Sequence, residues 1–93
     1  MDEKTYVVVR TYSAGVHVGV LGPKAGEEVT LTEARRVWYW EGANTLHEMA
    51  LRGVSKASKV SEAVPTITLR GWIELIPCSE EAERSLRTVA WKK

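Results

Sequence analysis

The sequence predicts a single α+β domain over residues 1–93, built on a small, mainly antiparallel curved sheet or open barrel of about five strands. A chain of 93 residues has room for one core only, since self-sufficient domains usually need roughly 100 residues. Segments of alternating β-branched residues are joined by short turns that contain glycine. Two further segments carry helix-start signals, which predict a short inserted helix and a C-terminal helix.

Alternation of apolar and polar residues locates the strands. Val7 and Val9 are expected on one face of the first strand, and Ser13–Gly15 is expected to turn the chain into a β-hairpin. We expect a loop at Gly22–Gly26, and a bulge or bend at Gly71, because glycine weakens a strand interior. The expected strands are residues 5–12, 16–21, 27–32, 35–40 and 66–76.

The helix signals lie in the middle and at the end of the chain. Thr45 and Glu48 have the spacing of a capping box, and Gly53 is placed to follow the last turn of the helix that begins there. Ser79 precedes two glutamates, which are favoured at the positive end of a helix dipole. Residues 54–65 are small and polar, and we expect them to form a loop.

Charge and cysteine content exclude several classes of function. Thirteen Lys and Arg against twelve Asp and Glu give a net charge of +1, so no sequence-specific binding to duplex DNA is expected. The single cysteine, Cys78, has no disulfide partner in the chain, which favours a reducing cytoplasm. No Cys/His cluster has metal-ligand spacing, so no metal or cofactor is expected. No apolar run approaches the roughly 18 residues of a membrane span.

Catalytic signals are sparse. The two imidazoles, His17 and His47, lie outside any nucleophile or metal motif, and no glycine-rich phosphate loop is present. The sequence therefore predicts no catalytic residue, and a small enzyme acting on a nucleotide is the third of three hypotheses.

The segment from Arg35 to Trp40 is the most unusual in a chain that has four Trp and no Phe. In a strand, Arg36, Trp38 and Trp40 share one face. One interpretation is that the rings stack on a base while Arg36 binds a phosphate. The alternative, which is the commoner role of large aromatic residues, is that Trp38 belongs to the core and that Arg36 packs its stem over Trp40.

Positive charge gathers around this segment. From Arg35 to Arg70 the chain has six Lys or Arg residues and three Glu residues, a balance that would attract an anion. The candidate ligand-binding residues are therefore Arg35, Arg36, Trp38, Trp40, Arg52, Lys56 and Lys59.

The block Ala34–Ala43, together with Gly53-Val54 and the segment Ile73–Ala82, resembles a family of small uncharacterised proteins of tailed bacteriophages. The mark of that family is an Arg-Arg-x-Trp-x-Trp-x-Gly-Ala pattern, and the resemblance transfers no catalytic residue. It implies a phage or prophage product in the bacterial cytoplasm. By analogy, small phage proteins that counter host immunity include oligomeric sponges for cyclic nucleotides or ADP-ribose-type signals.

Three functions follow as hypotheses. The first is a non-catalytic sponge that sequesters an anionic nucleotide-derived immune signal. The second is a protein-interaction module that inhibits a host protein or assists virion assembly, in which the same rings would be hot spots. The third is the small enzyme. A homo-oligomer is expected in each case, because large rings lie on both faces of the strand at 35–40.

Overall fold

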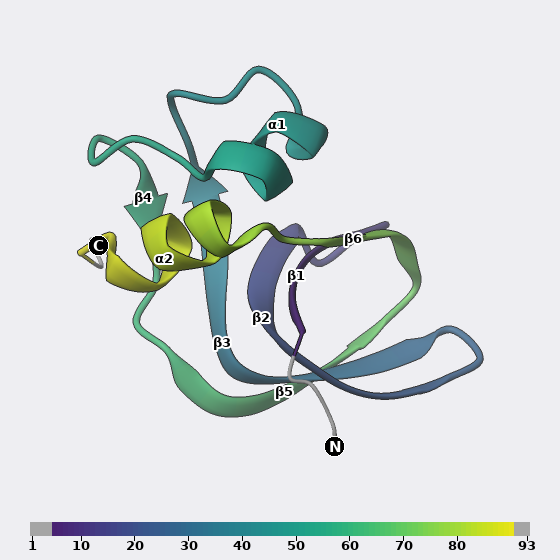
Figure 1. Cartoon of the computed structure of the whole chain (residues 1–93). Helices are drawn as coiled ribbons and strands as arrows, with labels where there is room; N and C mark the ends of the chain where they lie inside the picture. Colours follow the sequence, from purple (N-terminus) through teal and green to yellow (C-terminus); the bar gives the residue numbers. More distant parts are fainter. Residues whose placement is uncertain (1–4, 91–93) are drawn as a thin grey trace.

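The computed structural model describes residues 5–90, which form a curved antiparallel sheet with two helices packed against one side (Figure 1). This confirms the α+β class and the curved sheet. The elements, in chain order, are β1 (Tyr6–Thr11), β2 (Val16–Ala25), β3 (Glu28–Tyr39), α1 (Leu46–Arg52), β4 (Lys59–Val60), β5 (Val64–Arg70), β6 (Trp72–Pro77) and α2 (Glu80–Thr88). Neither helix of the described chain is long and apolar enough to cross a membrane.

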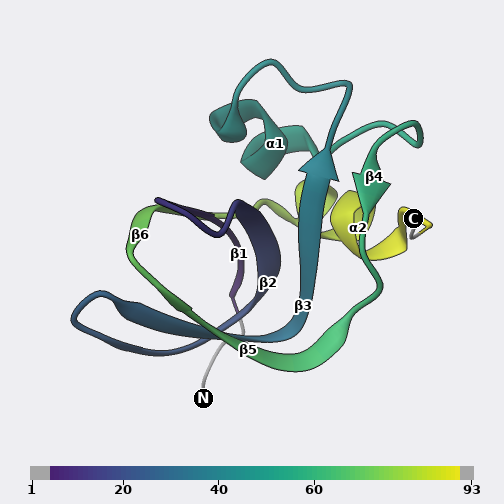
Figure 2. The ribbon, with the colours of Figure 1, turned by 180° about the vertical axis from the view of Figure 1, so that it is seen from behind.

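The sheet curves because the bent segment formed by β5 and β6 pairs with β3 at one end and with β1 at the other. The strand order is β4-β3-β2-β1-β6, and β5 pairs with β3 along Glu28–Ala34. Only Gly71 separates β5 from β6, so this segment passes from β3 to β1, as Figure 2 shows from behind. Gly71 has a φ of 77°, a conformation that glycine adopts at little cost. The bend expected at this position is confirmed.

Two apolar clusters lie on opposite faces of the sheet. Val7 and Val9 belong to one cluster and Val8 to the other, which confirms the alternation expected for the first strand. The first cluster contains buried residues from strands only: Val7, Val9, Val29, Leu31, Ala34 and Leu69. The second is covered by the helices: Tyr6, Val8, Val18, Val20, Val37, Met49, Ala50, Val60, Leu86 and Val89.

Side-chain caps fix where the helices begin. The Thr45 hydroxyl accepts a hydrogen bond from the Glu48 N–H (3.1 Å), and the Glu48 carboxylate accepts one from the Asn44 N–H (3.0 Å). The predicted cap is therefore confirmed. The Ser79 hydroxyl likewise accepts from the Ala82 N–H at the start of α2. Gly53, at a φ of 85°, ends α1 and donates its N–H to the Met49 carbonyl.

The expected strand boundaries are wrong in three places, because pairing with neighbouring strands of the sheet extends the elements. Strands expected at 27–32 and 35–40 form the single strand β3, with Glu33 at a φ of 53° between them. The loop expected at Gly22–Gly26 is strand as far as Ala25, where β2 pairs with β3. Residues 54–65, expected as a loop, include β4 and the start of β5, both of which pair with β3.

Candidate functional site

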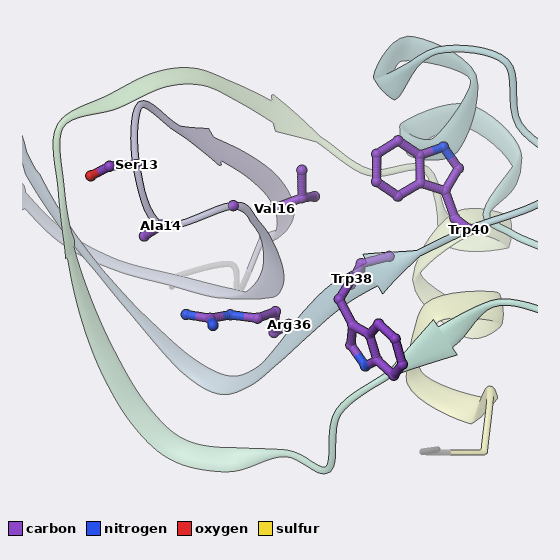
Figure 3. A pocket seen from close by; sticks show the side chains of 8 residues that line it. Ser13, Ala14, Val16, Arg36, Trp38 and Trp40 are labelled. Carbon is purple, nitrogen blue, oxygen red and sulfur yellow. The ribbon is translucent and has the colours of Figure 1, made fainter. Parts of the chain in front are cut away.

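A hollow of about 610 Å³ lies where the β1–β2 turn approaches the second half of β3 (Figure 3). The register explains its position, because Val16 pairs with Val37 and the turn before Val16 therefore lies beside the last residues of β3. We call this hollow the Arg36 pocket. It is lined by Ser13, Ala14, Gly15, Val16, Arg36, Val37, Trp38 and Trp40.

Among the described residues that line the pocket, Arg36 is the only charged one. Its backbone is held by Ser61, since the Arg36 N–H donates to the Ser61 hydroxyl (2.8 Å) and the Arg36 carbonyl accepts from the Ser61 N–H (2.8 Å). Its side chain is exposed, and within residues 5–90 no carboxylate forms an ion pair with it. An anion entering the pocket would therefore meet a guanidinium whose donors are available.

The two indoles have different environments. Trp38 is 48% exposed, so the interpretation that its ring is a core residue is wrong. Trp40 is partly buried and packs against the helix-covered cluster. Figure 3 shows the two rings pointing away from each other, contrary to the expected common face. The reason is that β3 ends at Tyr39, so strand alternation no longer sets the direction of the Trp40 side chain.

Arg35 lies on the opposite side of β3 from Arg36 and anchors the end of α2. It is 7% exposed, and its Nη1 donates to the carbonyls of Leu86 (2.9 Å) and Arg87 (3.1 Å). Its Nε donates to the Ser61 carbonyl at 2.8 Å. Burial lowers the pKa of this guanidinium from its ordinary value. Arg35 thus satisfies helix-terminal carbonyls, a structural role that its neighbour does not share.

The remaining candidate cations lie away from the pocket. The Lys59 ammonium is 5.2 Å from the ring centre of Trp38 and 5.9 Å from that of Tyr39, on the far side of Trp38. There, Lys59 lines a separate hollow of about 460 Å³ together with Trp38, Tyr39, Glu41 and Ala57. Arg52 ends α1 and Lys56 follows it in the next loop, and neither lines the Arg36 pocket. The structure brings together Arg36, Trp38 and Trp40.

The wall opposite β3 is the β1–β2 turn, which the sequence did not indicate as part of a site. The buried Thr11 hydroxyl accepts from the Ala14 N–H (2.7 Å) and donates to the Gly15 carbonyl (2.9 Å). The buried His17 donates its Nε2–H to the Ala14 carbonyl at 2.9 Å, and burial lowers the pKa of this imidazole. These bonds hold the turn in one shape. The hairpin prediction was the signal that could have located this wall. When the following strand pairs antiparallel with the second strand of a hairpin, its end lies beside the hairpin turn.

Within residues 5–90, no three His, Cys, Asp or Glu side chains are grouped so that they could hold a metal ion. A family comparison matches residues 4–86 to a model described as Domain of unknown function (DUF6948). The chain belongs to the DUF6948 family. No curated protein and no solved structure matches it. Membership of DUF6948 assigns no activity, so the function has to be argued from the Arg36 pocket.

Proposed function

We propose that this DUF6948 protein is a non-catalytic binding protein that sequesters a small anionic, nucleotide-derived ligand in the Arg36 pocket. The observation that carries the proposal is an exposed arginine without an ion-pair partner in the described chain, beside a half-exposed indole. Guanidinium groups pair with phosphates, and an exposed indole face stacks on a base. Small-molecule pockets usually have roughly 300–1,000 Å³, a range that includes this one.

The biological setting proposed for this binding is the one that the resemblance in sequence supports. The protein would be a phage or prophage product acting as an oligomeric sponge in the bacterial cytoplasm, and its ligand would be a cyclic nucleotide or an ADP-ribose-type immune signal. Exposed rings support self-association, since Tyr12 is 85% and Tyr39 is 43% exposed. A light-scattering mass near the 10.4 kDa of one chain would contradict the oligomer.

Thermal melts with a panel of cyclic dinucleotides and ADP-ribose derivatives test the binding. A ligand at 100 times its Kd stabilises the folded protein by about 2.7 kcal/mol. For a domain of this size, that corresponds to an increase in Tm of roughly 11–22 °C. A panel that leaves the Tm unchanged at millimolar concentration would contradict the proposal.

A second candidate function rests on the hollow on the far side of Trp38. There, Trp38 and Tyr39 are both about half exposed and Lys59 lies over both rings, a composition typical of a protein-binding hot spot. Tyr39→Ala separates the two functions, because Tyr39 does not line the Arg36 pocket. Loss of a co-purifying polypeptide from Tyr39→Ala, with no nucleotide bound to the parent, would favour an interaction module.

A further inference from the structure

Arg36 also borders a second, smaller hollow of about 260 Å³ on its other side. The sheet explains why this hollow exists. β3 pairs with β5 as far as Ala34 and with β4 from Val37 onwards, so the chain between β4 and β5 leaves a gap beside Arg35 and Arg36. We call this gap the small hollow. It is lined by His17, Ala34, Arg35, Arg36, Ser61, Val64 and Ile67.

The described residues that line the small hollow include Arg36, His17 and Ser61 beside three apolar residues, and none of them carries a carboxylate. His17 is 1% and Arg35 is 7% exposed, so both are held in place by burial. The Arg35 guanidinium donates to the carbonyls of Ser61, Leu86 and Arg87, so the charge available to the hollow is that of Arg36. An anion in the hollow would pair with the exposed Arg36 guanidinium, which forms no ion pair with a carboxylate in residues 5–90.

Size distinguishes the roles of the two hollows. The small hollow is below the roughly 300 Å³ at which pockets for whole small molecules begin, and it has the volume of about nine water molecules. It therefore suits one compact charged group. The Arg36 pocket is wider and is lined by indole rings, which suits a flat ring or a sugar. Arg36 lines both hollows.

We propose that the small hollow is a phosphate subsite, and that the two hollows together bind a phosphate ester whose base or sugar occupies the Arg36 pocket. This inference rests on the proposed function and deepens it, because it states which part of the ligand each hollow takes. The phosphate would accept hydrogen bonds from the guanidinium of Arg36, which borders the small hollow. A nucleoside monophosphate is the simplest ligand of this class.

The chain contains two histidines, which allows a direct test by NMR of the imidazole protons. His17 lines the small hollow, whereas His47 is exposed on α1 and serves as the internal control. AMP, inorganic phosphate and adenosine are titrated separately into the full chain. AMP and phosphate are expected to shift the His17 signal and to raise the pKa of His17, because a nearby anion favours the protonated imidazole. Adenosine is expected to leave that signal unchanged, and His47 should not respond to any of the three.

A hollow-filling variant provides the second arm of the test. Val64 is 41% exposed at the rim of the small hollow, so Val64→Trp fills the hollow without opening the core. Thr68→Trp, on the same strand but outside the lining, is the matched control. Calorimetry is expected to show that the parent and Thr68→Trp bind AMP at least about 10-fold more tightly than adenosine. Val64→Trp should bind both equally.

The outcomes separate the inference from the proposed function. If the parent binds AMP while Val64→Trp binds it equally well and the His17 signal does not move, the phosphate subsite is overturned and the Arg36 pocket remains. If the parent binds none of the three probes, the inference also fails, and the melts with cyclic dinucleotides and ADP-ribose derivatives decide separately on the proposed function.

Discussion

Two adjacent arginines should respond in opposite ways to substitution. Arg35 is buried and donates to three carbonyls, whereas Arg36 is exposed and its side chain pairs with no carboxylate in residues 5–90. Arg35→Ala leaves the buried Leu86 carbonyl without its donor. Arg36→Ala removes only a solvated side chain. The first change should therefore reduce the stability of the fold, and the second should not.

The expected loss of stability in Arg35→Ala follows from how deeply each carbonyl acceptor is buried. An unsatisfied buried carbonyl costs about 1–3 kcal/mol, and each of the two part-buried bonds contributes about 0.5–1.5 kcal/mol net. Relief of the desolvation of Arg35 offsets part of the sum. We expect Arg35→Ala to lower the free energy of unfolding by about 3 kcal/mol, which corresponds to a decrease in Tm of roughly 12–24 °C. Arg36→Ala should change that free energy by less than about 0.5 kcal/mol.

Urea denaturation followed by tryptophan fluorescence measures both variants. Arg35→Lys is the matched control, because lysine keeps the charge but cannot reproduce the planar fork, and it should recover only part of the loss. Equal unfolding free energies for Arg35→Ala and Arg36→Ala would refute the assignment of Arg35 as the anchor of α2. A larger loss in Arg36→Ala would refute it as well.

Three further predictions concern stability and are checked by the same denaturation assay. Trp38→Ala should lower the free energy of unfolding by about 1 kcal/mol because the ring is half exposed, whereas Leu31→Ala should lower it by about 2–5 kcal/mol because Leu31 is fully buried. Equal losses in the two variants would contradict this prediction. Gly53→Ala should lower the free energy of unfolding by more than about 2 kcal/mol, since the new Cβ would lie 2.3 Å from the Ser85 side chain of α2. Gly26 has a φ of 60° and open space around it, so Gly26→Ala should lower that free energy by only about 1 kcal/mol. Burial lowers the pKa of His17 below its ordinary 6.5, so the unfolded chain takes up the proton first, and the free energy of unfolding should fall as the pH drops below about 6.5. His17→Gln should weaken this pH dependence. A variant with the same pH profile as the parent would contradict the prediction.

Local signals in the sequence were sufficient for elements that neighbouring residues determine. The caps at Thr45 and Ser79 each depend on a hydroxyl that accepts from the backbone N–H three residues further along the chain, and both are where the pattern placed them. The bend at Gly71 is likewise local, because it needs one residue that tolerates a positive φ. These features could be predicted because no distant segment is needed to specify them.

Features that depend on distant pairing could not be predicted. β4 has two residues and exists because Val60 pairs with Val37, and β5 begins at Val64 because this residue pairs with Ala34. In the site, alternation placed Arg36 and Trp38 correctly beside each other. It did not show that Arg35 reaches the end of α2, which is 51 residues away along the chain. Nor did it show that the turn before Val16 forms the opposite wall.

The affinity ratio between two arginine variants tests most directly whether the Arg36 pocket binds an anion. The measurement is calorimetry with the panel ligand that gives the largest increase in Tm, on the parent, Arg36→Ala and Arg84→Ala. Arg84 is exposed on α2 away from the pocket, so its loss removes the same charge from the molecule as a whole. We predict a loss of roughly 10-fold to 150-fold for Arg36→Ala and less than about 2-fold for Arg84→Ala. Equal losses in the two variants, or undiminished binding by Arg36→Ala, would contradict the account.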